Sequence, residues 1–165
     1  MNEPKLSRLQ ASSWIAVVET YQECNRRYAA MLREFDLTVP QFDVLNAIHS
    51  LGDNALPKRI AERMLVTRGN VSGVLNRLQE HRLIVTRQTL NDRRSFVCEL
   101  TPAGAKRLDA AKTAAALFIE EQLSPFDEDE MQSIERKMRA MKTHLETLDP
   151  VAIALRAKTQ EELVA

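Results

Sequence analysis

The chain has 165 residues, of which 44% are hydrophobic and 28% are charged. This length and composition are typical of one globular domain, with or without extended arms, and argue against several independent domains. No apolar run approaches the roughly 20 residues that a membrane-spanning helix needs, and the N-terminus lacks the apolar segment of a signal peptide. We therefore expect a cytoplasmic protein that does not use a membrane as a partner.

Charge is distributed unevenly along a chain whose formal net charge is zero. Residues 57–94 contain nine Lys or Arg and three Asp or Glu, a net charge of +6, whereas residues 120–149 have a net charge of −5. A basic segment of this kind is the electrostatic signature of a surface that binds nucleic acid. The alternative is that both segments are ordinary solvated surface.

The spacing of apolar residues predicts helices for most of the chain. Residues 7–35 have apolar side chains at repeated steps of three and four, which is typical of a long amphipathic helix. Thr38 and Gln41 have the spacing of a capping box and start a second helix. Further helices are predicted from their caps and apolar periods over 39–50, 57–64, 68–81, 102–123 and 127–148.

Between the fourth and fifth of these helices the apolar period changes to two. This alternation predicts two strands over 84–89 and 95–100, joined by a polar turn with a basic tip. The last fifteen residues could be a short helix or a loose tail. The predicted order is therefore a long helix, a compact block of three helices and a hairpin, and then two more long helices.

The helix predicted over 68–81 has the features of a DNA-reading helix. On a helical wheel, Val71, Val74, Leu75 and Leu78 share one face, which predicts burial. The polar side and first turn contain the candidate DNA contacts Arg68, Gly69, Asn70, Ser72, Gly73, Asn76 and Arg77. Glycine inside a helix costs about 1 kcal/mol relative to alanine, so something must approach this face closely.

A DNA major groove explains that close approach. Asn76 can read adenine, Arg77 can bind guanine or phosphate, and Ser72 can bind phosphate. The alternative is that the glycines allow another helix of the protein to pack tightly. The hairpin tip adds Asp92, Arg93 and Arg94, which alone are typical of a solvated turn, but directly after such a helix the two arginines can reach the minor groove.

Four segments together resemble the pattern of the MarR family: LTVPQFDVLNAI at 37–48, VTRGNVSGVLNRLQEHRLIVTR at 66–87, NDRRS at 91–95 and ELTPAG at 99–104. The resemblance implies a winged helix-turn-helix regulator, mainly α with a small β-wing, that binds double-stranded DNA as a homodimer. It implies that Arg94 enters the minor groove with Asp92 as its anchor, which leaves Arg93 for phosphate. Arg82 departs from the pattern, because many relatives have glycine there.

We accordingly divide the chain into an N-terminal dimerisation helix (1–36), a winged helix-turn-helix lobe (37–101) and C-terminal dimerisation helices with a tail (102–165), within a single intertwined domain. Apolar residues near the C-terminus recur at alternating steps of three and four, the seam of a coiled coil that needs a partner helix. This predicted dimerisation seam consists of Met131, Ile134, Met138, Met141, Leu145 and Leu148.

We expect a repressor that binds a palindromic operator and is released by an effector. The resemblance implies a small aromatic or otherwise lipophilic anion, for which the candidate pocket residues are Trp14, Tyr21, Tyr28, Phe42 and His49. Each of these can equally be ordinary core packing. The sequence therefore leaves the identity of the effector open.

No enzymatic chemistry is indicated by the sequence. His49, His81 and His144 lie on three different predicted helices without metal-ligand spacing, so we expect no enzyme, metal or cofactor. Two other functions stay open. One is a redox-responsive regulator that uses Cys24 or Cys98, although both positions favour reduced core thiols. The other is a helical interaction protein that does not bind DNA.

Overall fold

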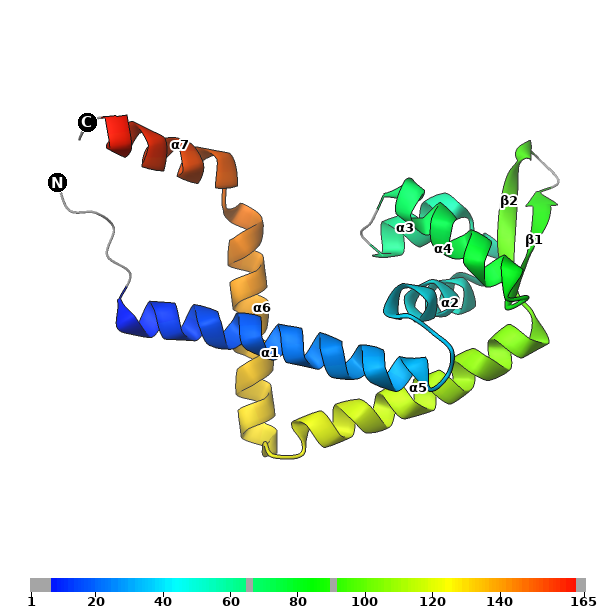
Figure 1. Ribbon diagram of the computed structural model, residues 1–165, viewed down its shortest axis with the longest axis horizontal. Helices are drawn as coiled ribbons and strands as arrows, with labels where there is room; N and C mark the ends of the chain where they lie inside the picture. Colours follow the sequence, from blue (N-terminus) through cyan, green and yellow to red (C-terminus); the bar gives the residue numbers. More distant parts are fainter. Residues whose placement is uncertain (1–6, 65–66, 90–91, 163–165) are drawn as a thin grey trace. The chain divides into compact units, whose positions relative to one another are not determined.

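The computed structural model describes residues 7–64, 67–89 and 92–162. Its elements in chain order are α1 (Arg8–Arg33), α2 (Val39–Leu51), the 3-10 turn η1 (Gly52–Asn54), α3 (Pro57–Met64), α4 (Arg68–Glu80), β1 (Ile84–Thr89), β2 (Asp92–Leu100), α5 (Pro102–Leu123), α6 (Glu128–Thr147) and α7 (Pro150–Glu162) (Figure 1). This mainly helical fold with a small antiparallel hairpin confirms the predicted fold class. The end of the chain, left open above, forms the helix α7.

The chain divides into two compact units, residues 1–119 and 120–165. In the first unit, α2 packs against α1, α3, α4 and β2, and α4 also packs against β1. In the second unit, α6 is exposed along its described length except for the half-buried Ser133. Among the described residues, no helix combines the length and the apolar character that a membrane span requires.

Helix starts follow from side-chain caps that the sequence supplies. At α2 the Thr38 N–H donates to Gln41 Oε1 at 2.9 Å, and the Gln41 N–H donates to Thr38 Oγ1 at 3.4 Å. Asp127 and Glu130 form the same reciprocal pair at the start of α6. Each pair satisfies backbone donors that have no partner inside the helix, which fixes the first turn. Both predicted capping boxes are confirmed.

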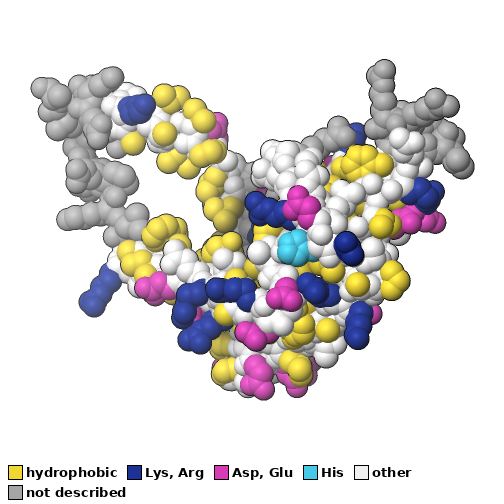
Figure 2. All heavy atoms as spheres, turned by 45° about the vertical axis from the view of Figure 1, so that its right-hand side comes forward, with side chains coloured by type: hydrophobic (Ala, Val, Ile, Leu, Met, Phe, Trp, Pro, Cys, Tyr) yellow, Lys and Arg dark blue, Asp and Glu magenta, His cyan; other side chains and the backbone are white. Residues whose placement is uncertain are grey.

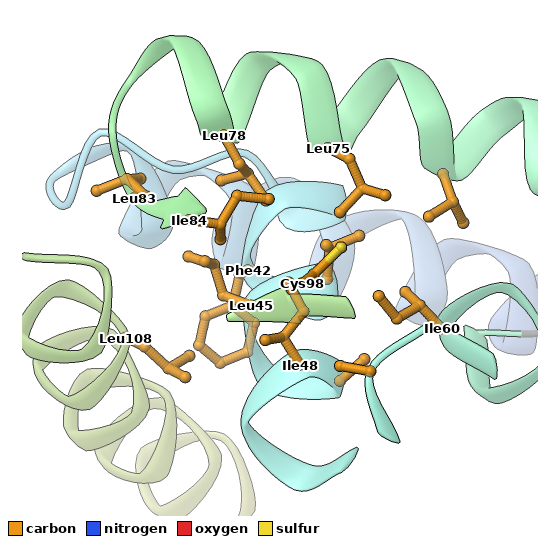
Figure 3. Packing of buried hydrophobic residues seen from close by; sticks show 14 of the residues in the cluster. Phe42, Leu45, Ile48, Ile60, Leu75, Leu78, Leu83, Ile84, Cys98 and Leu108 are labelled. Carbon is orange, nitrogen blue, oxygen red and sulfur yellow. The ribbon is translucent and has the colours of Figure 1, made fainter. Parts of the chain in front are cut away.

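The hydrophobic core of the first unit is built around α2. Its side chains come from α2, α4, both strands and α5, and they point toward one another in Figure 3. The labelled members are Phe42, Leu45, Ile48, Ile60, Leu75, Leu78, Leu83, Ile84, Cys98 and Leu108. Burial of such side chains stabilises a fold by about 1.5–3 kcal/mol each, so this cluster holds α4 and the hairpin in place.

The turn between α4 and β1 has the geometry of a helix C-cap. The Leu83 N–H donates to the Leu78 carbonyl at 2.9 Å, and the Arg82 N–H donates to the Gln79 carbonyl at 2.8 Å. Between them Arg82 adopts a φ of 57°, the left-handed conformation that favours glycine. The departure at Arg82 therefore leaves the turn intact but places a non-glycine residue in a strained conformation.

Helix α5 begins in direct contact with that turn. The Thr101 N–H donates to the Leu83 carbonyl at 3.0 Å, and the Thr101 hydroxyl donates to the Arg82 carbonyl at 2.8 Å. The same hydroxyl oxygen accepts the Gly104 N–H at 3.0 Å. A Cβ on Gly104 would lie 1.9 Å from the Leu83 oxygen, so only glycine fits. The segment Thr101–Gly104 thus fastens α5 to the end of α4.

Gly104→Ala should destabilise the protein, although alanine is the better helix former. Overpacking of this kind costs about 1–3 kcal/mol, and the obstructing atom belongs to backbone that cannot rotate away. Thermal unfolding followed by circular dichroism should show a lower Tm than wild type. The matched control is Gly73→Ala, another helical glycine, where an added Cβ has no atom within 4 Å. An unchanged or higher Tm for Gly104→Ala would contradict the contact.

Candidate nucleic-acid interface

Helix α4 has one buried face and one exposed face. Val71, Leu75 and Leu78 are 1%, 2% and 0% exposed, and Val74 is half-buried. The predicted buried face is therefore confirmed. The candidate DNA contacts on this helix whose side chains the structure describes are all exposed: Gly69, Asn70, Ser72, Gly73, Asn76 and Arg77. The side chain of Arg68 lies outside the described part.

The glycines of this exposed face have no packing role inside the chain. A Cβ on Gly73 would meet no atom within 4 Å, and one on Gly69 would meet only Thr67 Oγ1 at 3.9 Å. Tight packing against another described element, the alternative interpretation of these glycines, is therefore absent. The helix bears the stability cost of two glycines with no compensating contact in this unit.

Some cations of the basic segment are neutralised by neighbouring carboxylates. Arg87 on β1 donates to Glu99 on β2 at 2.7 Å and lies 4.0 Å from Asp53, while Lys58 lies 3.7 Å from Glu62. By contrast, Arg59, Arg63, Arg77 and Arg82 are exposed and form no ion pair with another described residue. On the face shown in Figure 2, Lys and Arg side chains alternate with Asp and Glu and form no continuous patch.

The wing is anchored to the helix-turn-helix lobe near its base. Gln79 Nε2 on α4 donates to Thr86 Oγ1 on β1 at 3.2 Å, and the Cys98 N–H on β2 donates to the Ala55 carbonyl at 3.0 Å. The strands pair antiparallel from Ile84↔Leu100 to Gln88↔Phe96. The side chains of Asp92, Arg93 and Arg94, together with residues 90–91, lie outside the described part, so their predicted contacts stay predictions.

A cavity of about 600 Å³ lies on the other side of α4, between α2, α3 and α4. Its apolar lining comes from Pro40, Ala47, Met64, Val71 and Val74, and its polar lining from Asp43, Asn46, Arg63 and Asn70. None of the five predicted pocket residues lines it. Sequence reasoning missed this cavity, although Asp43 and Asn46 are spaced as polar neighbours on the side of α2 away from its core residues.

Asp43 joins this cavity to α1. Burial raises the pKa of the Asp43 carboxyl above its ordinary value. The pKa of Tyr28 is also raised, first by burial and then by the nearby charge of Asp43. No hydrogen bond or ion pair links the Asp43 side chain to another residue that the structure describes, so its carboxylate is poorly compensated.

The five predicted pocket residues do not share one site. Tyr28 meets Phe42 edge-on at 6.1 Å and Phe118 at 5.4 Å, forming an aromatic cluster between α1, α2 and α5. Trp14 and Tyr21 are 67% and 71% exposed on α1. His49 lines a separate cavity of about 220 Å³ beside Cys98 and Glu99.

The cysteines and possible metal ligands offer little chemistry. Cys98 is fully buried, and burial raises the pKa of its thiol to about 11, so it is a poor nucleophile at neutral pH. Cys24 is half-buried on α1. Within residues 7–64, 67–89 and 92–162, no group of three or more His, Cys, Asp or Glu is placed to hold a metal ion.

Comparison with known proteins identifies the family. A family model described as "MarR family" matches residues 35–95. An HTH-type transcriptional regulator of Bacillus cereus (strain ATCC 10987) is 31% identical over 125 residues, which cover 76% of this chain and 80% of the relative. The chain belongs to the MarR family. It is therefore a DNA-binding transcriptional regulator and not an enzyme.

Two solved MarR-type structures have the same fold. A mutant MarR from E. coli complexed with operator DNA has a TM-score of 0.68 at 22% identity, covering 76% of this chain and 90% of that one. The organohalide-sensing regulator RdhR in its 2,4-dichlorophenol-bound form has a TM-score of 0.74 at 17% identity, covering 87% of this chain and 85% of that one. At such identities the likeness establishes the shared fold.

Asp43→Asn should stabilise the protein at neutral pH. Because the folded state raises the pKa of this carboxyl, it binds the proton more tightly than the unfolded state does. Ionisation therefore costs stability as pH rises through the raised value, whereas below the ordinary value of 3.8 both states are protonated and the cost vanishes. The Tm difference between variant and wild type should grow from pH 4 to pH 7.

The matched control for this measurement is Asp109→Asn, which removes an exposed carboxylate from α5 and should show no such trend. A Tm for Asp43→Asn that falls below wild type at pH 7 would mean that the carboxylate stabilises the fold.

Proposed function

We propose that this MarR-family protein is a homodimeric repressor that reads a palindromic operator with α4 and the wing and is released by a small lipophilic or aromatic ligand. The observation that carries the DNA-reading part is the exposed face of α4. Two glycines there have no packing role within the chain, so close approach of an outside molecule is the remaining physical reason for them.

The chemistry of this face suits a major groove. Asn76 can form two hydrogen bonds with adenine, and Arg77 can do so with guanine. The missing side chains at Gly69 and Gly73 allow base edges or backbone to approach the helix. Ser72, Asn70 and Arg68 lie toward the first turn, where backbone amides and the helix dipole favour phosphate. We assign these residues to binding and positioning of DNA on that basis.

The wing supplies a second, less sequence-specific contact in this proposal. Arg94, oriented by Asp92, enters the minor groove, where a narrow A·T-rich segment has enhanced negative potential. Arg93 binds phosphate beside it. Arg87 is excluded from this role, because Glu99 and Asp53 already neutralise it.

Gly73→Ala should separate stability from DNA binding. The substitution replaces a poor helix former by the best one at an open position, so stability should rise by about 1 kcal/mol. The added methyl group should obstruct the groove and weaken operator binding at least about tenfold, a loss of roughly 1.4 kcal/mol. Thermal unfolding and fluorescence anisotropy with operator DNA measure the two effects in the same preparation.

Asn76→Ala is the companion variant, and it should relax specificity at one or two base pairs, by about 1–3 kcal/mol, without loss of stability. Thr113→Ala on the exposed surface of α5 is the control and should leave DNA binding unchanged. If Gly73→Ala binds the operator as tightly as wild type, the exposed face of α4 is not the reading face.

Dimerisation is proposed from the uncovered seam of the second unit. Its six apolar residues are between 37% and 59% exposed, and their steps of three and four place them along one stripe. An apolar stripe of this length on an isolated helix is unfavourable in water, and a second copy of the helix covers it in a coiled-coil arrangement. A two-fold dimer also matches a palindromic site with half-sites one helical turn apart.

Met138→Glu should weaken the dimer, because the new carboxylate would be buried without a partner in the seam. A cost of about 3 kcal/mol raises the dimer dissociation constant roughly 100-fold. Analytical ultracentrifugation over a concentration series measures this constant. Ala140→Glu, which adds the same charge to α6 outside the seam, should change it little. A wild-type protein that stays monomeric at micromolar concentration would contradict the dimer itself.

Release by a ligand is the remaining part of the proposal. RdhR in the comparison above was solved with 2,4-dichlorophenol bound, and the shared fold makes a comparable response reasonable here. Of the predicted pocket residues, Tyr28 and Phe42 form a common aromatic wall next to Asp43. Trp14 and Tyr21 are exposed on α1, where a second copy or a ligand can cover them.

A further inference from the structure

The cavity between α2, α3 and α4 combines an apolar lining with polar side chains that have no partner. Ala47 and Val71 are buried, Val74 and Met64 are half-buried, and together they form its apolar surface. Asp43, Asn46, Arg63 and Asn70 also line it, and their side chains make no hydrogen bond or ion pair with any other residue of the described ranges. We propose that this cavity is the effector site and that it binds a small aromatic or lipophilic ammonium ion.

This inference rests on the proposed function, since it names the site and the chemical class of the releasing ligand. It replaces the anionic ligand implied by the family resemblance with a cationic one. The cavity volume of about 600 Å³ lies within the range of roughly 300–1,000 Å³ that is usual for small-molecule sites. A single ring with a short side chain fits a space of this size.

The charge on Asp43 selects the ligand's charge. Its carboxylate is partly desolvated and uncompensated, as the raised pKa of this carboxyl shows. An ammonium group beside it gains a charge-assisted hydrogen bond and removes the cost of leaving the carboxylate unpaired. A carboxylate or phenolate ligand there would instead add a second negative charge. The acidic side of the cavity therefore favours a cation.

Arg63 fixes the orientation of such a ligand. It belongs to α3, across the cavity from Asp43 on α2, and it has no carboxylate partner among the described residues. The ammonium group is repelled from the α3 side and attracted to the α2 side. The ring then lies over the apolar surface formed with α4, where Asn46 and Asn70 offer further hydrogen bonds.

Occupancy of this cavity is placed to affect DNA binding. Val71 and Val74 belong to α4, and on this helix they lie on the side away from Gly73 and Asn76. A ligand that contacts α4 from the core side changes the helix's position only if it binds one arrangement more tightly than another. We infer that it favours an arrangement in which α4 no longer fits the groove, which produces release.

Three nearly isosteric probes test the charge assignment on the full-length protein without DNA. They are 2-phenylethylammonium, the neutral 2-phenylethanol and the anionic 3-phenylpropionate. Isothermal titration calorimetry should show millimolar or tighter binding of the ammonium ion and at least about tenfold weaker binding of the other two, a difference of roughly 1.4 kcal/mol. Amide NMR shifts should change at Asp43, Val71 and Val74.

Asp43→Asn should weaken binding of the ammonium ion at least tenfold, while Asp109→Asn should leave it unchanged. Because Asp43→Asn is expected to be at least as stable as wild type at neutral pH, unfolding cannot produce this loss. Equal binding of the alcohol or the carboxylate, unaltered binding by Asp43→Asn, or no binding of the ammonium ion at millimolar concentration would each overturn the site.

The same probe added to a protein–operator complex tests the effector role. Saturating 2-phenylethylammonium should weaken operator binding of wild type, and Asp43→Asn should resist the effect at the same concentration. Binding by calorimetry with no change in operator affinity would overturn the effector assignment. Calorimetry involves no DNA, so a wild-type protein that fails to bind any operator contradicts the proposed function and leaves the ammonium site standing.

Discussion

The close approach of α5 to the Leu83 carbonyl is the constraint on which the DNA-binding lobe depends. Gly104 has no side chain to keep α5 away, and Thr101 supplies three hydrogen bonds across the same junction. Leu83 and Ile84 follow the end of α4 directly and are buried, so the junction sets where the first strand begins. The end of the reading helix, the base of the wing and the start of α5 are therefore held as one piece.

Helix α4 shows how stability and function are divided between two sides of one element. Its core side contributes Val71, Leu75 and Leu78 to the best-packed part of the unit. Its exposed side gives up helix propensity at two glycines and places Asn76 and Arg77 in solvent. The packing cluster around α2 compensates for that loss, because it holds α4 through tertiary contacts and not through propensity.

Much of this architecture was predictable from local signals. Capping pairs such as Thr38 with Gln41 and Asp127 with Glu130 mark helix starts, and the apolar period identified the buried side of α4. Arg82 was less predictable, because a turn that favours glycine is here formed by an arginine whose carbonyl and amide are both hydrogen-bonded.

The candidate sites were predictable only where a single element carries them. The exposed residues of α4 follow from one helical period, but the cavity beside Asp43 requires three helices to be placed together, which no local pattern encodes. For the same reason, five aromatic or histidine residues chosen as a pocket separate in space. Tyr28 and Phe42 meet, whereas Trp14, Tyr21 and His49 lie elsewhere.

The exposed seam on α6 has a consequence for how such a regulator would respond to its own abundance. If a second copy covers this stripe, the DNA-binding species forms in proportion to the square of the protomer concentration, and the fold's apparent stability also rises with concentration. Dilution during growth would then empty the operator more steeply than a monomer would. Half a heptad more or less of apolar surface on α6 would set the copy number at which its target genes switch.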